Sequence, residues 1–284
     1  CIACNQDCVV DSPMNPRLGC VHNASAGREA ELGDETIVPA ARPRRVMVVG
    51  AGPAGLEAAR VAALCGHSVD LYEREKSPRG QVGVAAVGPG RGELGKVIRY
   101  LEVQVQKLGV RLHTNEEITV ERVIAARPDA VIVATGAQAA PPPFPVTGEA
   151  QIVDEMQVLL NRPPVGPRVV VVDETGLPRG ASTAEFLADQ GCEVTVVTGD
   201  MFVSPQLTAT HDLALWYQRA LSKGINFLPQ TLVRRVEGRR VVIADRFSRE
   251  ERGLEEVDTV VLVLYRLPRQ DLYLALKAQG LEVY

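Results

Sequence analysis

The sequence predicts an α/β fold with two doubly wound, parallel-sheet domains that follow a short cysteine-rich loop. Three observations predict it. A strand, a glycine-rich turn, a helix and a second strand can be traced through residues 45–73, a partial repeat of that unit covers residues 168–198, and four cysteines lie within the first twenty residues. An internal repeat of this kind indicates two copies of one α/β domain type.

Size and composition suit this fold and exclude several classes of partner. The 284 residues are enough for about two domains, and 46% hydrophobic content supports buried cores. Charged residues, glycines or prolines interrupt every apolar run before the roughly eighteen residues that a membrane span needs. A net charge of −4, with no basic stripe, argues against nucleic acid. We expect a cytoplasmic protein that binds neither membrane nor nucleic acid.

The first unit has the pattern of a dinucleotide site. Residues 46–49 form an apolar run that suits a buried parallel strand. Gly50 permits a sharp turn, Gly52 lets a pyrophosphate approach the backbone, and Gly55 lets the next helix pack on the strand. That helix, expected over residues 53–65, directs free N–H groups and the positive end of its dipole at the phosphates. The alternative is a glycine turn in an α/β unit that binds nothing.

An acidic residue completes the pattern. Glu73 ends the second strand roughly twenty residues after the turn, where a carboxylate can accept hydrogen bonds from both hydroxyls of a ribose. The residues predicted to contact the dinucleotide in this unit are Gly50, Gly52, Pro53, Ala54, Gly55, Glu73 and Arg74.

The cysteine loop has the spacing C-x2-C-x3-C-x11-C, formed by Cys1, Cys4, Cys8 and Cys20. Four thiolates on a short irregular loop can surround one metal centre, and ligation by sulfur alone selects an iron–sulfur cluster or zinc. Structural zinc favours two C-x2-C pairs, whereas this spacing has one. Disulfides are a further alternative, although disulfide scaffolds spread their cysteines through a small domain. We predict a [4Fe–4S] cluster and keep the other two as alternatives.

Two segments connect these units. Residues 24–43 are small and polar with charges of both signs, which indicates an extended connector. After a predicted strand over residues 130–134, the prolines at positions 141–143 and 145 form a stiff exit from the first domain.

The second unit repeats the first along its helix and second strand. The two align without a gap, so that Gly180 falls on Gly55 and Thr198 falls on Glu73. The turn between strand and helix is two residues longer than in the first unit. Thr198 has no carboxylate for a ribose.

The longer turn predicts a lost site. Asp173 stands where the first turn has Gly50, and Glu174 adds a second carboxylate. At about 4 Å and an effective dielectric of about 20, each carboxylate–phosphate contact costs about 4 kcal/mol. A helix dipole returns only about 0.3–1 kcal/mol. Arg179 could supply one positive charge, but the balance disfavours NAD(P)H binding here.

Taken together, these features resemble a known family. The cysteine loop, the segment Asn23-Ala-Ser-Ala-Gly-Arg-Glu29 and the segment Val48-Val-Gly-Ala-Gly-Pro-Ala-Gly-Leu-Glu57 are similar to the C-terminal half of iron–sulfur flavoenzymes that include 2,4-dienoyl-CoA reductase and trimethylamine dehydrogenase. The likeness covers nearly the whole chain, with Ala24 in place of a usual proline. It implies that the four cysteines hold a [4Fe–4S] cluster and that the first domain binds FAD, or ADP in its place.

The resemblance also implies contacts on the flavin side. The family commonly shows Gly-Gly-Gln near the flavin, and here Arg79 replaces the first glycine while Gly80 and Gln81 remain, which predicts a local loss of backbone freedom. Thr135 and Gly136 match a second signature of FAD-dependent two-domain reductases. The implied contacts are Gln81, Thr135 and Gly136.

The function implied by the resemblance is electron relay. In the family an FMN in a separate β/α barrel reacts with substrate, and that barrel is absent from this chain. The cluster would accept single electrons from it and pass them to an electron-transferring flavoprotein, as in trimethylamine dehydrogenase, whose second domain is similarly eroded. We expect an oligomeric assembly and assign no catalytic residue or substrate.

Two alternatives stay open. One is an NAD(P)H-dependent 2,4-dienoyl-CoA or enoate reductase, in which the second domain feeds hydride to FAD. The other is a non-catalytic ADP-binding module of a larger assembly.

The expected domains are residues 1–43 (cluster loop and connector), 44–150 (FAD or ADP), 151–265 (degenerate NAD(P)-binding-like domain, inserted in the first) and 266–284 (return segment). The chain begins with Cys1 rather than Met, and it stops where the family would continue. We therefore expect it to be a piece of a longer protein.

Overall fold

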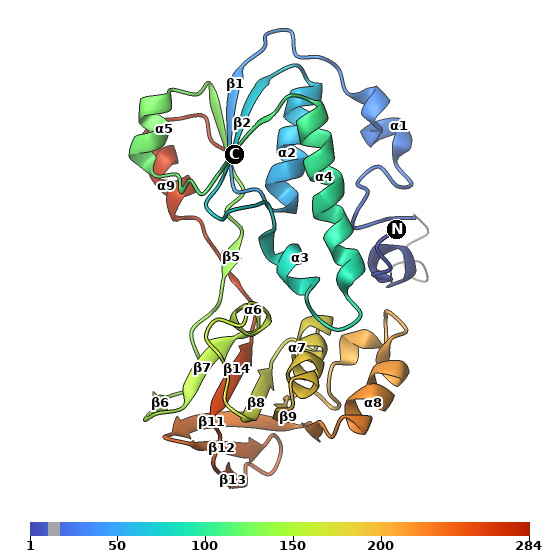
Figure 1. Cartoon of the computed structure of the whole chain (residues 1–284), viewed down its shortest axis with the longest axis vertical. Helices are drawn as coiled ribbons and strands as arrows, with labels where there is room; N and C mark the ends of the chain where they lie inside the picture. The colour runs from blue at the N-terminus through green and yellow to red at the C-terminus, as the bar shows by residue number, and fades with distance from the viewer. Residues whose placement is uncertain (11–17) are drawn as a thin grey trace.

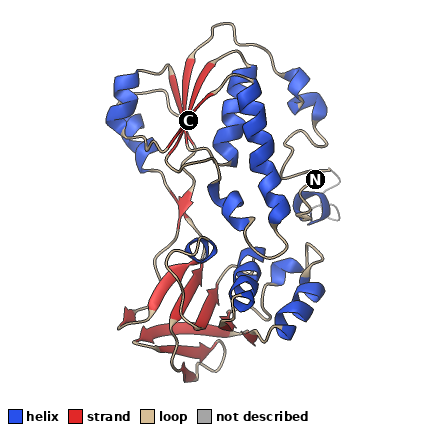
Figure 2. Ribbon diagram, in the orientation of Figure 1, coloured by secondary structure: helices blue, strands red, loops and turns tan. Residues whose placement is uncertain are grey.

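A computed structural model describes residues 1–10 and 18–284 and has two lobes joined by a narrow two-stranded connection (Figures 1 and 2). The first lobe contains a parallel sheet with strand order β3-β2-β1-β4. Its elements are β1 (Arg45–Val49), α2 (Pro53–Leu64), β2 (Ser68–Glu73), α3 (Gly80–Ala85), α4 (Gly95–Lys107), β3 (Arg111–Thr114), α5 (Val120–Ala126), β4 (Ala130–Val133) and α9 (Asp271–Ala278). Near the N-terminus lie η1 (Gln6–Val10), α1 (Glu29–Leu32) and η2 (Asp34–Thr36), and η3 (Gly92–Leu94) precedes α4.

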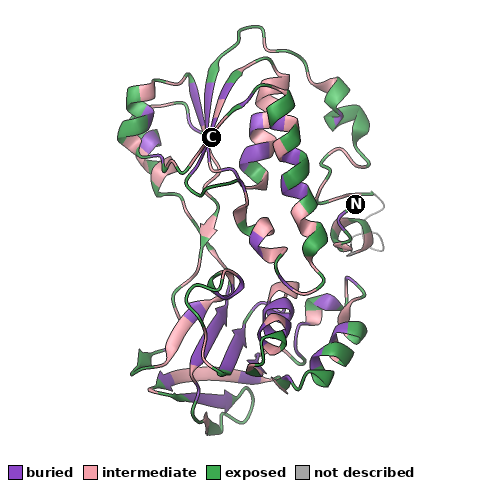
Figure 3. Ribbon diagram, in the orientation of Figure 1, coloured by how far each residue is buried: buried purple, intermediate pink, exposed green. Residues whose placement is uncertain are grey.

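Strand β1 is central because its side chains serve two cores. Val46 and Val48 pack with α2 and α4, while Met47 and Val49 pack with α5 and α9 on the opposite face. Alternate residues of a strand point to opposite faces, so a strand covered on both sides must be apolar throughout. Figure 3 shows the resulting band of buried residues along the sheet.

The second lobe contains a five-stranded parallel sheet with strand order β10-β9-β8-β14-β7. Its elements are β7 (Gln151–Asp154), α6 (Glu155–Leu159), β8 (Arg168–Asp173), α7 (Pro178–Asp189), β9 (Glu193–Val197), η4 (Pro205–Leu207), α8 (Leu213–Ser222), β10 (Asn226–Leu228) and β14 (Thr259–Val263). Helices α7 and α8 cover one face of this sheet, where Val169 and Val171 of β8 pack against them.

The other face of this sheet is covered by a second sheet rather than by helices. Its strands, in the order β13-β12-β11-β6, are β6 (Val146–Thr147), β11 (Thr231–Glu237), β12 (Arg240–Asp245) and β13 (Glu251–Leu254). Val170 and Val172 of β8 pack against Val241 and Ile243 of β12. The α/β class and the parallel sheets are confirmed, and this covering sheet is an addition to the doubly wound plan.

The second lobe is inserted into the first. Strands β5 (Ala137–Gln138) and β15 (Leu267–Pro268) pair antiparallel and carry the chain out and back. After α9, the last residues return to the first sheet, where Val283 bridges Val131 in parallel (Figure 1). Among the described residues, no helix is both long enough and apolar enough to cross a membrane.

Candidate functional site

The first glycine turn is compact because two of its glycines touch backbone. Gly50 has φ +102°, and a methyl group added there would lie 2.4 Å from the carbonyl oxygen of Ala134. A methyl group on Gly55 would lie 1.8 Å from the carbonyl oxygen of Gly50. Both contacts are far below van der Waals distance, so the turn requires glycine at these two positions.

The remaining glycine of this turn, Gly52, faces open space. A methyl group on Gly52 would have one neighbour within 4 Å, the Cα of Gly80 at 3.6 Å. Helix α2 begins directly after it with Pro53. The first-turn N–H groups of a helix have no partner within the helix, and Ala54 and Gly55 lie in that turn. The arrangement gives an anion room and donors at Gly52, at the positive end of a twelve-residue helix.

Glu73 is buried at the end of β2 and its carboxylate faces the turn. It accepts hydrogen bonds from the backbone N–H of Ala51 at 2.9 Å and from that of Glu75 at 3.0 Å. The side chain of Arg74 is exposed and lies 3.8 Å from the Glu75 carboxylate. The Glu73 carboxylate is therefore fixed beside the turn by backbone donors, whereas the Arg74 side chain is exposed.

Arg79 precedes helix α3 as its N-cap residue. The sequence predicted that replacing a glycine here would cost backbone freedom, and Arg79 lies at φ −153° and ψ −56°, outside the left-handed region that favours glycine. Gly80 alone takes the left-handed conformation, at φ +56°, and packs against Gly52. The side chain of Gln81 donates to the carbonyl oxygen of Ala137 at 3.3 Å. Residues 79–81 therefore pack against the glycine turn with Gly80 at the one position that requires glycine.

Thr135 and Gly136 bring in a residue that sequence reasoning missed. The Thr135 hydroxyl donates to the carbonyl oxygen of Arg269 at 2.9 Å, and the Arg269 N–H donates to the carbonyl oxygen of Gly136 at 2.9 Å. Burial, with Arg74 and Arg266 nearby, lowers the pKa of the Arg269 guanidinium. In the sequence, only the expected return of the chain to the first domain could have indicated Arg269. That return brings Arg269 beside residues that precede it by more than one hundred positions.

The cysteine loop is anchored to the first core by Ile2, which is buried, and by Cys4, which packs beside it. All six cysteines are free thiols, and the Ala3 N–H lies 3.4 Å from the Cys1 sulfur. A cavity of about 280 Å³ adjoins Cys20. This donor set suits an iron–sulfur cluster. The described residues nevertheless contain no group of three or more His, Cys, Asp or Glu side chains placed to hold a metal.

The second turn differs from the first in the way the alignment indicated. Helix α7 begins at Pro178, 125 positions after Pro53, whereas β8 begins at Arg168, 123 positions after Arg45. The two extra residues therefore lie in the turn. Thr198, which takes the place of Glu73, is buried and accepts a hydrogen bond from the Asp200 N–H at 3.2 Å.

The sequence predicted that the Asp173 carboxylate would repel a phosphate as an exposed charge. The structure corrects this prediction, because the carboxylate is turned inward. The Asp173 side chain is fully buried inside the turn. One carboxylate oxygen accepts from the N–H of Thr175 at 2.9 Å, from the Thr175 hydroxyl at 2.8 Å and from the N–H of Gly176 at 3.1 Å. Burial raises the pKa of Asp173 above its usual value.

The Arg179 side chain contacts Leu264 and Glu155. It donates to the carbonyl oxygen of Leu264 and lies 3.3 Å from the carboxylate of Glu155. Arg266 donates to the same Glu155 oxygen at 3.0 Å. Burial outweighs both arginines and raises the pKa of Glu155. The one positive charge predicted to assist a phosphate therefore belongs to a buried ion cluster.

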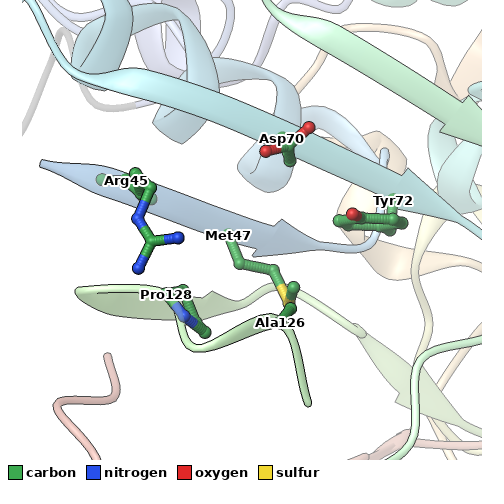
Figure 4. A pocket seen from close by; sticks show the side chains of 7 residues that line it. Arg45, Met47, Asp70, Tyr72, Ala126 and Pro128 are labelled. Atoms are coloured by element: carbon green, nitrogen blue, oxygen red, sulfur yellow. The ribbon is translucent and has the colours of Figure 1, made fainter. Parts of the chain in front are cut away.

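A separate cavity of about 60 Å³ lies beside β1 and β2 (Figure 4). It is lined by Arg45, Val46, Met47, Asp70, Tyr72, Ala126 and Pro128, and by none of the predicted site residues. It is too small for a nucleotide, but it adjoins an ion cluster. Asp70 accepts from Arg111 at 2.8 Å and pairs with His113 at 2.9 Å.

This cluster predicts a pH dependence of stability. The hydrogen bond from Arg111 is the largest of several effects that together hold the pKa of Asp70 below its usual value. Burial alone would raise this pKa, and the hydrogen bond with His113 lowers it further. Such a group stabilises the fold above its unfolded pKa of about 3.9 and loses that contribution as pH falls through the folded-state pKa. Asp70→Asn should therefore lower Tm at pH 7 and lose this effect toward pH 3 in thermal melts. The exposed Glu149→Gln variant is the control, and a pH-independent difference for Asp70→Asn would contradict the account.

Comparison with known proteins places these features in context. Residues 44–284 match the family model described as pyridine nucleotide-disulphide oxidoreductase. The chain is 40% identical to the bilirubin reductase of Mediterraneibacter gnavus over 69% of this chain and 30% of that protein. It is 33% identical to a probable N-methylproline demethylase of Rhizobium meliloti over 91% of this chain and 38% of that protein.

A solved structure agrees along almost the whole chain. The 6-hydroxypseudooxynicotine amine oxidase of Pseudomonas geniculata N1 superposes with a TM-score of 0.90 at 28% identity, covering 98% of this chain and 43% of the other. The chain thus spans about a third of the length of the curated relatives it matches. These matches confirm the resemblance noted from the sequence.

Proposed function

The chain belongs to the pyridine nucleotide-disulphide oxidoreductase family, and we propose that it is the electron-relay portion of an iron–sulfur flavoprotein oxidoreductase that acts on amines. In this proposal the first domain binds FAD, or ADP in its place, and the cysteine loop carries a [4Fe–4S] cluster. Electrons come from an FMN in a β/α barrel and leave to an electron-transferring flavoprotein. NAD(P)H is not a reactant.

The observation that carries the proposal is the contrast between the two turns. The first leaves open space at Gly52 in front of helix α2. The second is filled by the buried Asp173, and Thr198 replaces the ribose-binding acid. One chain thus combines a turn suited to a dinucleotide with one that is not, which supports a bound flavin nucleotide without a nicotinamide donor.

The residues proposed to hold the dinucleotide have separate tasks. Gly50 and Gly55 shape the turn, Gly52, Pro53 and Ala54 admit the pyrophosphate, and Glu73 takes the ribose hydroxyls. Arg74, Gln81, Thr135 and Gly136 line the outer part of the site. The Thr135 hydroxyl and the Gly136 carbonyl oxygen are fixed there by hydrogen bonds with the Arg269 backbone.

The residues proposed to hold the cluster are Cys1, Cys4, Cys8 and Cys20. Such a cluster, when bound, carries one electron at a time. The chain's part is to supply four thiolates and to shield the site, and the packing of Ile2 and Cys4 on the first core supports this role. The Ala3 N–H beside the Cys1 sulfur would stabilise a thiolate there.

The relatives support amine oxidation and a separate substrate domain. A demethylase and an amine oxidase match over 91% and 98% of the chain. Both are more than twice as long as the matched part, which leaves room for a barrel fused to the chain or bound to it.

A reductase is the second candidate, favoured by the 40% identity to a bilirubin reductase over a shorter segment. An NAD(P)H-dependent 2,4-dienoyl-CoA or enoate reductase would need the second domain to deliver hydride to FAD. Reduction of the bound flavin by NADPH distinguishes this candidate from the relay.

Metal and nucleotide analysis of the anaerobically purified chain tests the proposal. We expect about four iron and four sulfide ions per chain, as a [4Fe–4S] cluster requires, together with FAD or ADP released on denaturation. Cys4→Ser should lose most of the iron and keep the nucleotide. Cys192→Ser, which removes a thiol that donates toward Gly166 in the second lobe, should keep both. Zinc in place of iron, or full iron in Cys4→Ser, would contradict the proposal.

A further inference from the structure

We propose that the second nucleotide-binding turn is occupied by the chain itself, with the Asp173 carboxyl group on the backbone donors that a dinucleotide pyrophosphate would use. Asp173 is then the specificity-determining residue that excludes nicotinamide dinucleotides. The inference rests on the proposed relay, because a chain that passes electrons outward has no use for a nicotinamide site.

The Asp173 carboxyl group packs against helix α7. Gly180 in α7 is the counterpart of Gly55, and a methyl group added to Gly55 would meet the backbone of its own turn. A methyl group on Gly180 would instead lie 2.4 Å from Asp173 Oδ2 and 2.7 Å from its Cγ. The Asp173 carboxyl group therefore lies between the end of β8 and the first turn of α7, on the side where the Gly50 carbonyl oxygen lies in the first turn.

The hydrogen-bond donors of the second turn are already used by Asp173. A phosphate in such a turn is held by backbone N–H groups. Here the N–H groups of Thr175 and Gly176 and the Thr175 hydroxyl all donate to Asp173 Oδ1. The other oxygen, Oδ2, is buried and has no hydrogen-bond partner within the described part of the chain. A ligand would have to break three internal hydrogen bonds before it gained any.

The outer side of the second turn is covered by the segment that contains η4. A methyl group on Gly176 would lie 2.8 Å from the ring of Pro205 and 2.8 Å from Asp200 Oδ2. The N–H of Gln206 donates to the carbonyl oxygen of Gly176 at 3.1 Å. The η4 segment thus packs on the second turn and closes it from outside, whereas only Gly80 lies within 4 Å of a methyl group on Gly52 in the first turn.

Occupation and repulsion make different predictions for two substitutions. Asn has the shape of Asp and keeps an oxygen acceptor without the charge, so Asp173→Asn should leave the turn closed. Asp173→Gly and Asp173→Ala remove the carboxyl group, so they should release the donors. If repulsion were the cause, Asp173→Asn would open the site as well as the smaller residues do.

The test is calorimetric titration of NADH and NADPH into the chain with its own nucleotide still bound in the first domain. We expect no binding at millimolar concentration to the wild type, to Asp173→Asn or to the exposed control Glu174→Gln. Asp173→Gly and Asp173→Ala should bind at least one dinucleotide about tenfold or more tightly than the wild type. Circular dichroism and Tm establish that each variant is folded.

Each contrary result has a distinct meaning. Equal binding by Asp173→Asn and Asp173→Gly would overturn occupation, as would failure of both smaller residues to bind in a folded protein. Neither result touches the relay. Binding of NADPH by the wild type with reduction of its flavin would overturn the relay itself.

Discussion

Replacing Gly52 with alanine is expected to weaken binding of the flavin dinucleotide by about tenfold or more, or at least about 1.4 kcal/mol, while the fold is kept. The methyl group would have one protein neighbour within 4 Å, at an ordinary contact distance of 3.6 Å from Gly80. The space it takes is where the pyrophosphate approaches the backbone. The measurement is the Kd for FAD and for ADP on the nucleotide-free chain, with Tm recorded alongside.

Gly92→Ala is the matched control, because a methyl group there has no neighbour within 4 Å among residues 1–10 and 18–284 and lies outside the turn. It should change neither affinity nor Tm. Unchanged affinity in Gly52→Ala would contradict the assignment of this turn as the dinucleotide site.

Replacing Gly55 with alanine is expected to lower stability as well as affinity. Its methyl group would lie 1.8 Å from the Gly50 carbonyl oxygen and 3.0 Å from the carbonyl carbon, so the turn or helix α2 must shift. Overpacking of this kind costs about 1–3 kcal/mol and occasionally more. Urea unfolding of the nucleotide-free chain measures the loss, and the nucleotide should be lost with it.

Gly180→Ala supplies the comparison in the second domain. Its methyl group would meet the Asp173 side chain at 2.4 Å rather than backbone, and a side chain yields more readily. A smaller loss of stability with no loss of bound nucleotide is expected. Equal losses in the two variants would mean that the two turns do not differ in the way described.

The parts of the fold that the sequence predicted well are those set by local pattern. The apolar run that becomes β1, the turn at Gly50 and the helix that starts at Pro53 each depend on residues within a few positions of one another. The repeat could also be recognised from local pattern, because the residues of α7 match those of α2 at a constant spacing in the sequence. Insertion of the second lobe was also expected, and the return of the chain through β15 and the bridge from Val283 to Val131 agree with it.

The parts that could not be predicted depend on where side chains point in three dimensions. Asp173 reads as a surface charge in the sequence, yet the longer turn folds it inward onto its own N–H groups. Arg179 contacts Glu155, the first residue of helix α6, and Leu264, which follows β14. Arg269 joins the first site only through the return of the chain. No spacing rule encodes such distant contacts.

The most direct test of the relay is an absorption spectrum of the anaerobically purified chain before and after addition of NADH, NADPH and then dithionite. With FAD in the first domain we expect flavin peaks and a broad iron–sulfur shoulder, and with ADP in its place the iron–sulfur absorption alone; in both cases neither nicotinamide nucleotide should bleach the spectrum and dithionite should. Rapid bleaching by NADPH would contradict the relay, because the closed turn at Asp173 could not then exclude the nucleotide, and the reductase would become the better account.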